Sequence, residues 1–387
     1  MKASLGDVSV PGLLRLARSN AANTRRTYAA LGEALVNGGT ADVMVTDWQR
    51  SILSQMLRQV VGDIYSSLRW LVLAEMEDEA DAGRGGALSP IAPDSEARLF
   101  SLMSRCGLLA DIELIEAITH RLYQHQLEQA TRPPDRNRWT NEPSLDDPHE
   151  FFGQASPEFS PVNRRIAAYV VDRSRRTDRY GNPVLVPGEI EARLYERLHW
   201  HVAAALRQML AEQSGENLQL LDARIETAAV ETIRHSLAIS AAPTSAAEAA
   251  RALESAGLLN IETVYRLLKA GEISLFEDCF SRLAGMRPVL LRRLLYEAGG
   301  ECFAVLARAL EVEFDRALSL FALTRSEMTQ QFCGGNGGSN PLKAIYDTVS
   351  VEDANLVRAH WMRQPDFACA LWEAETNRSE DFRKALH

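Results

Sequence analysis

The stretch MVTDWQRSILSQMLRQVVGDIYSSLRWLVLAEM, residues 44–76, decides the fold class of this 387-residue chain. Within it an apolar residue recurs at every fourth position, at Ile52, Met56, Val60, Ile64 and Leu68. Residues four apart lie on one face of an α-helix, which turns once in about 3.6 residues. The stretch therefore predicts a long amphipathic helix, with Thr46 or Asp47 as its N-cap.

The same spacing continues through nearly every ordered stretch of the chain, and it predicts an all-α fold. Two segments, YRLLKAGEISLF (265–276) and RRLLYEAGGECF (292–303), each read as a helix, a glycine C-cap and a second helix. Such stacked amphipathic pairs indicate a HEAT-like helical repeat. Helix–turn–helix pairs within an ordinary bundle are the alternative interpretation.

Breaks in the pattern predict the domain boundaries. The segment 131–161 is polar, proline-rich and aperiodic, and CGGNGGSNP (333–341) is rich in glycine. We therefore expect two helical lobes and a C-terminal helical extension, divided as follows: 1–130, a linker at 131–161, 162–332, a linker at 333–340, and 341–387.

The amino-acid composition argues against several classes of function. The net charge of −10 argues against a nucleic-acid partner. Five scattered cysteines without a C-x-x-C pair suggest reduced thiols and a cytoplasmic protein. The apolar runs fall short of the roughly 20 residues that a membrane helix needs, so we expect no membrane insertion.

His199 and His201, in YERLHWHVAAALRQML (195–210), raise the question of a metal site. Two residues apart on a helix point to different sides, so a single ion cannot bind both. Glu196 and His199 form an E-x-x-H pair, but a bundle di-iron site needs a second such motif. We therefore predict no metal ligands, no cofactor and no catalytic residues.

The most basic stretch, RRIAAYVVDRSRRTDRYG (164–181), supplies the candidate binding residues. Guanidinium groups bind phosphates and carboxylates through paired hydrogen bonds. The stretch is interpreted either as a site for an anion or an acidic partner, or as a solvated face paired with nearby acids. Its arginines are Arg164, Arg165, Arg173, Arg175, Arg176 and Arg179.

Tryptophans in helical stretches are candidates for core or for contact surfaces. Trp200 points away from the stripe that contains Leu198, so it is either buried between two layers or part of a partner surface. Trp70, Trp361 and Trp372 are interpreted as core residues.

Several of these stretches resemble an uncharacterised bacterial family, the domain of unknown function 2336, common in alphaproteobacteria. The resemblance lies in DRSRRTDRYGNPVLVPGEIEARLYERLHWHVAAALRQ (172–208) and in the run from Leu275 to Arg325, with further agreement at 13–35 and 52–76. It implies an all-α fold with helical-repeat character near the N-terminus. It carries no catalytic residues over to this chain.

These observations favour a non-enzymatic interaction or regulatory module of the bacterial cytoplasm that binds a protein partner in helix-lined grooves. A homo-oligomer is compatible with the same surfaces. The alternative is a sensor or enzyme for an anionic small molecule, such as a nucleotide or phosphorylated metabolite, at Arg164–Arg179.

Overall fold

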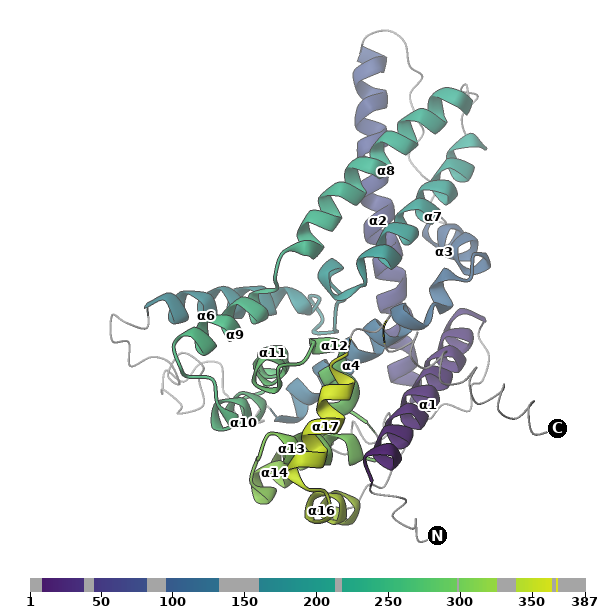
Figure 1. Ribbon diagram of the computed structural model, residues 1–387. Helices are drawn as coiled ribbons and strands as arrows, with labels where there is room; N and C mark the ends of the chain where they lie inside the picture. The colour runs from purple at the N-terminus through teal and green to yellow at the C-terminus, as the bar shows by residue number, and fades with distance from the viewer. Residues whose placement is uncertain are drawn as a thin grey trace, which may run out of the picture. The chain divides into compact units, whose positions relative to one another are not determined.

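The fold was analysed in a computed structural model, shown in Figure 1. The structure describes residues 9–37, 45–81, 95–131, 160–212, 218–297, 299–325, 339–363 and 367. Within these residues it contains fifteen α-helices and no β-strand, which confirms the all-α fold. The predicted linkers at 131–161 and 333–340 lie almost entirely outside the described residues, and the predicted domain boundaries stay predictions.

Close contacts between Cα atoms divide the chain into two compact units. Unit 1 comprises Met1–Ala21, Leu259–Leu268 and Phe276–His387. Unit 2 comprises Ala22–Leu258 and Lys269–Leu275. The first helix, α1 (Val10–Asn37), contributes residues to both.

Unit 2 is built around the long helix predicted at 44–76. This helix, α2 (Asp47–Asp81), packs against both α7 (Ala192–Ala211) and α8 (Leu218–Ala241), which also pack against each other (Figure 1). Thr46 is its N-cap, since its Oγ1 accepts from the Gln49 amide at 3.2 Å. The predicted apolar stripe is buried throughout: Ile52, Met56, Val60, Ile64 and Leu68.

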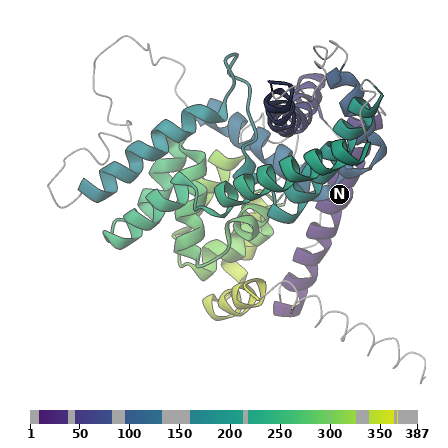
Figure 2. The same cartoon turned by 90° about the horizontal axis from the view of Figure 1, so that it is seen from above.

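The other helices of unit 2 complete its core. They include two pairs that pack together: α2 with α4, and α6 with α9, the latter visible in Figures 1 and 2. A single antiparallel bridge joins Thr177 to Pro183 after α6. The bounds are α3 (Ser95–Arg105), η1 (Leu108–Ala110), α4 (Ile112–Thr131), α6 (Ser160–Arg173), η3 (Ser174–Arg176), η4 (Pro187–Glu189) and α9 (Ser245–Ser255).

Unit 1 consists mainly of short helices, with α13 packed against α12, α14, α16 and α17. The two helix–glycine–helix pairs predicted from sequence both form; the turn of the first contains Gly271 (φ 76°), which belongs to unit 2, and the turn of the second contains Gly300 (φ 77°), in unit 1. A continuing repeat stays a prediction. The bounds are α10 (Ile261–Lys269), α11 (Ile273–Ala284), α12 (Pro288–Leu295), α13 (Glu301–Ala309), α14 (Phe314–Thr324), α16 (Ser339–Thr348) and α17 (Val351–Trp361).

One core prediction is wrong. Trp70 is 69% exposed, because it lies about 200° around α2 from the buried Leu68. Helix register, rather than the apolar character of indole, decided its placement. Trp361 is partly buried, and Trp372 lies outside the described residues.

None of the described helices combines the length and the apolar character that a bilayer-spanning segment needs.

Candidate functional site

The six arginines of the candidate site divide into two groups by burial. They lie on α6, on η3 and on the loop that follows, all within unit 2. Arg173 and Arg176 turn into the interior, whereas the other four arginines are exposed. The two groups therefore have different roles.

Arg173 belongs to a buried network around Glu272. Glu272 is only 2% exposed. Its carboxylate accepts hydrogen bonds from Arg173 Nη1 and from the Tyr169 hydroxyl, the latter at 3.0 Å. Burial, followed by the negative charge of Glu272, holds the pKa of Tyr169 well above its ordinary value. The positive charge of Arg173 is thus paired with the carboxylate of Glu272 inside unit 2.

Arg176 fixes the irregular segment after α6. Its Nη1 donates to the Ser274 hydroxyl and lies 3.5 Å from Glu189 Oε1. Its carbonyl oxygen accepts a hydrogen bond from Arg121 Nη2 of α4 at 2.7 Å. These contacts hold a stretch whose own regular structure is limited to the short helix η3 and one isolated bridge.

The remaining four arginines face solvent. Arg165 Nη1 pairs with Glu248 Oε2 at 2.6 Å, and the Arg179 guanidinium lies 4.7 Å from the centre of the Tyr180 ring. Neither Arg164 nor Arg175 has an ion pair with any described residue. Together with Arg179, whose printed contact is with an uncharged ring, these are the exposed site residues without an ion pair to a described carboxylate.

The helix that raised the metal question separates its two histidines. His199 is buried and its Nδ1 contacts the Tyr195 carbonyl at 2.9 Å, whereas His201 contacts the Arg197 carbonyl. Burial lowers the pKa of His199. Trp200, between them, is 38% exposed. Across the described residues, no three His, Cys, Asp or Glu side chains gather as metal ligands.

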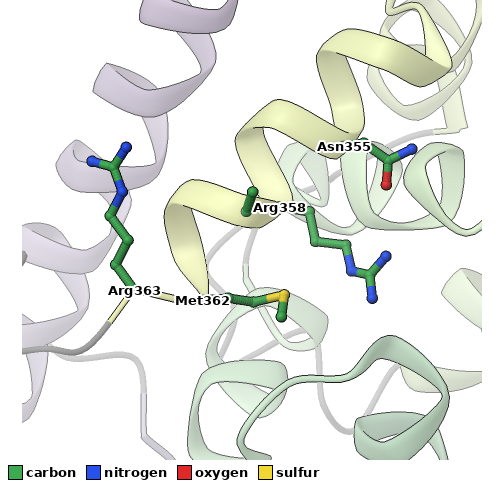
Figure 3. A pocket seen from close by; sticks show the side chains of 5 residues that line it. Asn355, Arg358, Met362 and Arg363 are labelled. Atoms are coloured by element: carbon green, nitrogen blue, oxygen red, sulfur yellow. The ribbon is translucent and has the colours of Figure 1, made fainter.

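Sequence reasoning missed a surface hollow in unit 1, which we call the α17 hollow. Its larger part, about 360 Å³, is lined by Asn355, Arg358, Ala359, Met362 and Arg363. An adjoining part, about 170 Å³, shares Met362 and is lined by Gly285, Met286, Arg287 and Leu290. Figure 3 shows Asn355, Arg358 and Met362 on one side of α17, while Arg363 extends in another direction.

Local structure positions these side chains firmly. The Ser350 hydroxyl caps α17 by accepting from the Asp353 amide at 3.0 Å. Arg358 then donates through Nε (2.9 Å) and Nη2 (2.5 Å) to the carbonyl of Ala284, the last residue of α11. A cation at a helix C-terminus is favourable, so Arg358 is fixed in place at the hollow.

The hollow is basic and apolar. Its lining contains three arginines and no carboxylate. Met362 is 44% exposed, and Leu356 and Val289, which adjoin lining residues in the sequence, are also exposed. The sequence signal that could have revealed it is RAHWMR (358–363), a basic segment at the end of a predicted helix.

Comparison with known proteins places this chain in a family. The model of the family described as "Uncharacterised protein conserved in bacteria (DUF2336)" matches residues 157–359, which include α6 and most of α17. No curated protein and no solved structure matches the chain. Because the family model covers more than half of the chain, this protein belongs to the DUF2336 family of bacterial proteins.

Proposed function

We propose that this protein is a non-enzymatic interaction and regulatory module of the bacterial cytoplasm. It binds an acidic, amphipathic helix of a partner protein in the α17 hollow. The observation that carries the proposal is a lining that contains three arginines and an exposed methionine and no carboxylate.

The shape of the hollow supports a helix rather than a small metabolite. Small-molecule sites enclose most of the ligand surface, whereas this hollow is open to solvent and lies between α17 and the residues that follow α11. Amphipathic helices bind such grooves through apolar residues at three- and four-residue spacing. Methionine adapts to different apolar partners, which suits Met362 to this contact.

Charge supports an acidic partner. The whole chain carries a net charge of −10, so the positively charged lining of the hollow contrasts with the negative charge of the chain as a whole. Arg287 and Arg363 have no ion pair with any described residue, and their guanidinium groups can pair with carboxylates of a partner. Arg358 is already held by Ala284, so binding costs little ordering of its side chain.

The thiols support a reducing compartment. Among the described residues, Cys106, Cys279 and Cys302 form no disulfide, and Cys106 is exposed. Disulfides are rare in the bacterial cytoplasm, where thiols are kept reduced.

The test measures binding of a labelled synthetic peptide, about 18 residues long, with leucines at helical spacing and glutamates elsewhere. We expect the full chain to bind it, with weaker binding at high salt. Reversing two charges, in Arg287→Glu with Arg363→Glu, should weaken binding at least about tenfold. Arg164→Glu is the matched control: an exposed arginine of unit 2 that should leave binding unchanged.

Two results would overturn the proposal. One is equal binding of a peptide in which lysines replace the glutamates. The other is a shift from dimer to monomer by light scattering when Arg287 and Arg363 are reversed, because the hollow would then be an interface between two copies of this chain.

A second candidate function is a sensor for an anionic small molecule at the exposed arginines of α6 and η3. Arg164 and Arg175 favour it, because no described carboxylate compensates them. Thermal-shift measurements with nucleotides and phosphorylated metabolites test it. A shift lost in Arg164→Ala and Arg175→Ala supports a sensor; Arg176→Ala is unsuitable because it breaks a buried contact.

A further inference from the structure

The α17 hollow follows one face of α17 as far as the end of that helix. The lining residues that α17 and its C-terminal end supply recur at three- and four-residue intervals, which places them on one helical face: Asn355, Arg358, Ala359, Met362 and Arg363. The residues from Gly285 to Leu290, after α11, supply a second wall. At a rise of 1.5 Å per residue the face on α17 is roughly 12 Å long. The hollow therefore has the length of about two turns of a second helix.

The chain turns directly after the hollow. Gln364 and Pro365 follow Arg363, the last lining residue on this side. Proline lacks the amide hydrogen that a continuing helix needs, and it disfavours helical backbone at the residue before it. Two helices joined by about two to five residues form an antiparallel hairpin. A helix that begins at Pro365 would therefore run back along α17.

The sequence of residues 365–377, PDFACALWEAETN, is that of a short amphipathic helix. Apart from Phe367, this segment lies outside the described residues. Phe367 is helical and 57% exposed, so its ring is available for a further apolar contact. The apolar residues that share its helical face span two turns, as the face on α17 does: Phe367, Ala370, Leu371 and Ala374.

The charges of this segment complement those of the hollow. The segment contains three carboxylates and no lysine or arginine, whereas the lining contains three arginines and no carboxylate. At about 100° per residue, Glu375 lies about 80° to one side of Phe367, and Glu373 lies about 120° to the other. The carboxylates thus flank the apolar face on both sides. Arginines likewise stand on both walls of the hollow, since Arg287 follows α11 and Arg358 lies on α17.

We infer that residues 365–377 fold back as a helix into the α17 hollow and block it against a partner. This autoinhibitory contact rests on the proposed function, because it concerns the occupant of the same hollow. A short connection holds the segment near the hollow at an effective concentration of about a millimolar. The apparent affinity for a partner helix is then reduced by the fraction of molecules in which the hollow is open.

Hydrogen–deuterium exchange of the full chain tests the docking without a partner. An isolated helix of this length is marginal in water, so protected amides in residues 366–377 report a contact with the rest of the chain. We expect such protection in the wild type. Reversing Arg287→Glu with Arg363→Glu should speed exchange of the segment about tenfold or more. Arg164→Glu with Arg175→Glu is the matched control, two exposed arginines of unit 2 whose reversal should leave the segment protected.

A charge exchange tests the pairing itself. Glu373→Lys with Glu375→Lys should remove the protection, and combining it with Arg287→Glu and Arg363→Glu should restore the protection, because each wall then faces the opposite charge again. The lysine variant changes no described residue, so it keeps the test decisive if the arginine variant fails to fold.

Release of the segment should also open the hollow. We expect Glu373→Lys with Glu375→Lys to bind the labelled acidic peptide roughly tenfold more tightly than the wild type does. Glu380→Lys with Asp381→Lys makes the same change in net charge further along the chain and should leave the affinity unchanged.

The outcomes separate this inference from the proposed function. Equal exchange of residues 366–377 in the wild type and in Arg287→Glu with Arg363→Glu would refute the docking, even where the peptide binds. Protection that rises with protein concentration would refute it too, because the segment would then occupy the hollow of a second copy. Charge-dependent protection without peptide binding in any variant supports the docking and refutes only the proposed function.

Discussion

Arg121 of α4 donates from Nη2 to the backbone carbonyl of Arg176, 55 residues further along the chain, at 2.7 Å. Its Nε donates to the Val184 carbonyl at 3.2 Å, and its Nη1 lies 3.7 Å from Glu128. One buried guanidinium therefore holds both sides of the irregular segment between α6 and η4. This contact anchors part of the region that contains the candidate binding arginines.

Arg121→Met should destabilise unit 2 by about 2 to 4 kcal/mol. The substitution roughly keeps the volume but removes the positive charge beside Glu128 and a donor from each of two carbonyls. Urea unfolding followed by circular dichroism measures the loss. Arg164→Met, on the exposed face of α6, should change stability by less than about 0.5 kcal/mol; equal losses in both variants would contradict the anchoring role.

Tyr169→Phe should cost about 1 to 2 kcal/mol, because the buried Glu272 loses one of its two donors. Combining it with Arg173→Met should be non-additive, since both side chains serve the same carboxylate. A double-mutant cycle by urea unfolding measures the coupling. Strict additivity would indicate that the two donors act independently.

Glu297→Gln should stabilise unit 1 at alkaline pH and have little effect at pH 4.5. Burial raises the pKa of the Glu297 carboxyl in the folded state to about 7, above its ordinary value of 4.5. The folded state therefore binds the Glu297 proton more tightly than the unfolded state does. The contribution of this proton to the free energy of unfolding is complete below pH 4.5 and is lost as the pH rises through 7. The difference between wild type and variant should grow to at most about 3 kcal/mol by pH 8.5. Thermal unfolding across this pH range measures it, and a difference independent of pH would contradict the assignment.

Gly300→Ala should destabilise unit 1 by about 2 kcal/mol or more, because the left-handed backbone and the Phe321 ring both exclude a Cβ. Gly62→Ala is the matched substitution, since Gly62 lies inside α2 with open space around its Cα. It should stabilise the chain by roughly 0.5 to 1 kcal/mol, as alanine favours helix. Thermal unfolding of the two variants measures the contrast, and the same sign of change in both would contradict it.

The sequence by itself determined the fold class, the helices and their buried faces. The stripe from Ile52 to Leu68 is buried as its four-residue spacing predicts, and Thr46 caps the helix. The same spacing already excluded Trp70 from that face, so its assignment to the core followed residue type instead of register. These properties are local, because helical periodicity relates residues within a few turns of each other.

Only the tertiary structure decided which arginines remain available. Arg173 and Arg175 are two positions apart, yet one is bound to Glu272, about a hundred residues away, and the other is exposed. The α17 hollow and the contact between Asn20 and Glu297 likewise join segments distant in sequence. Whether a charge is neutralised or available depends on the groups that packing brings within a few ångströms, and local spacing carries no information about them.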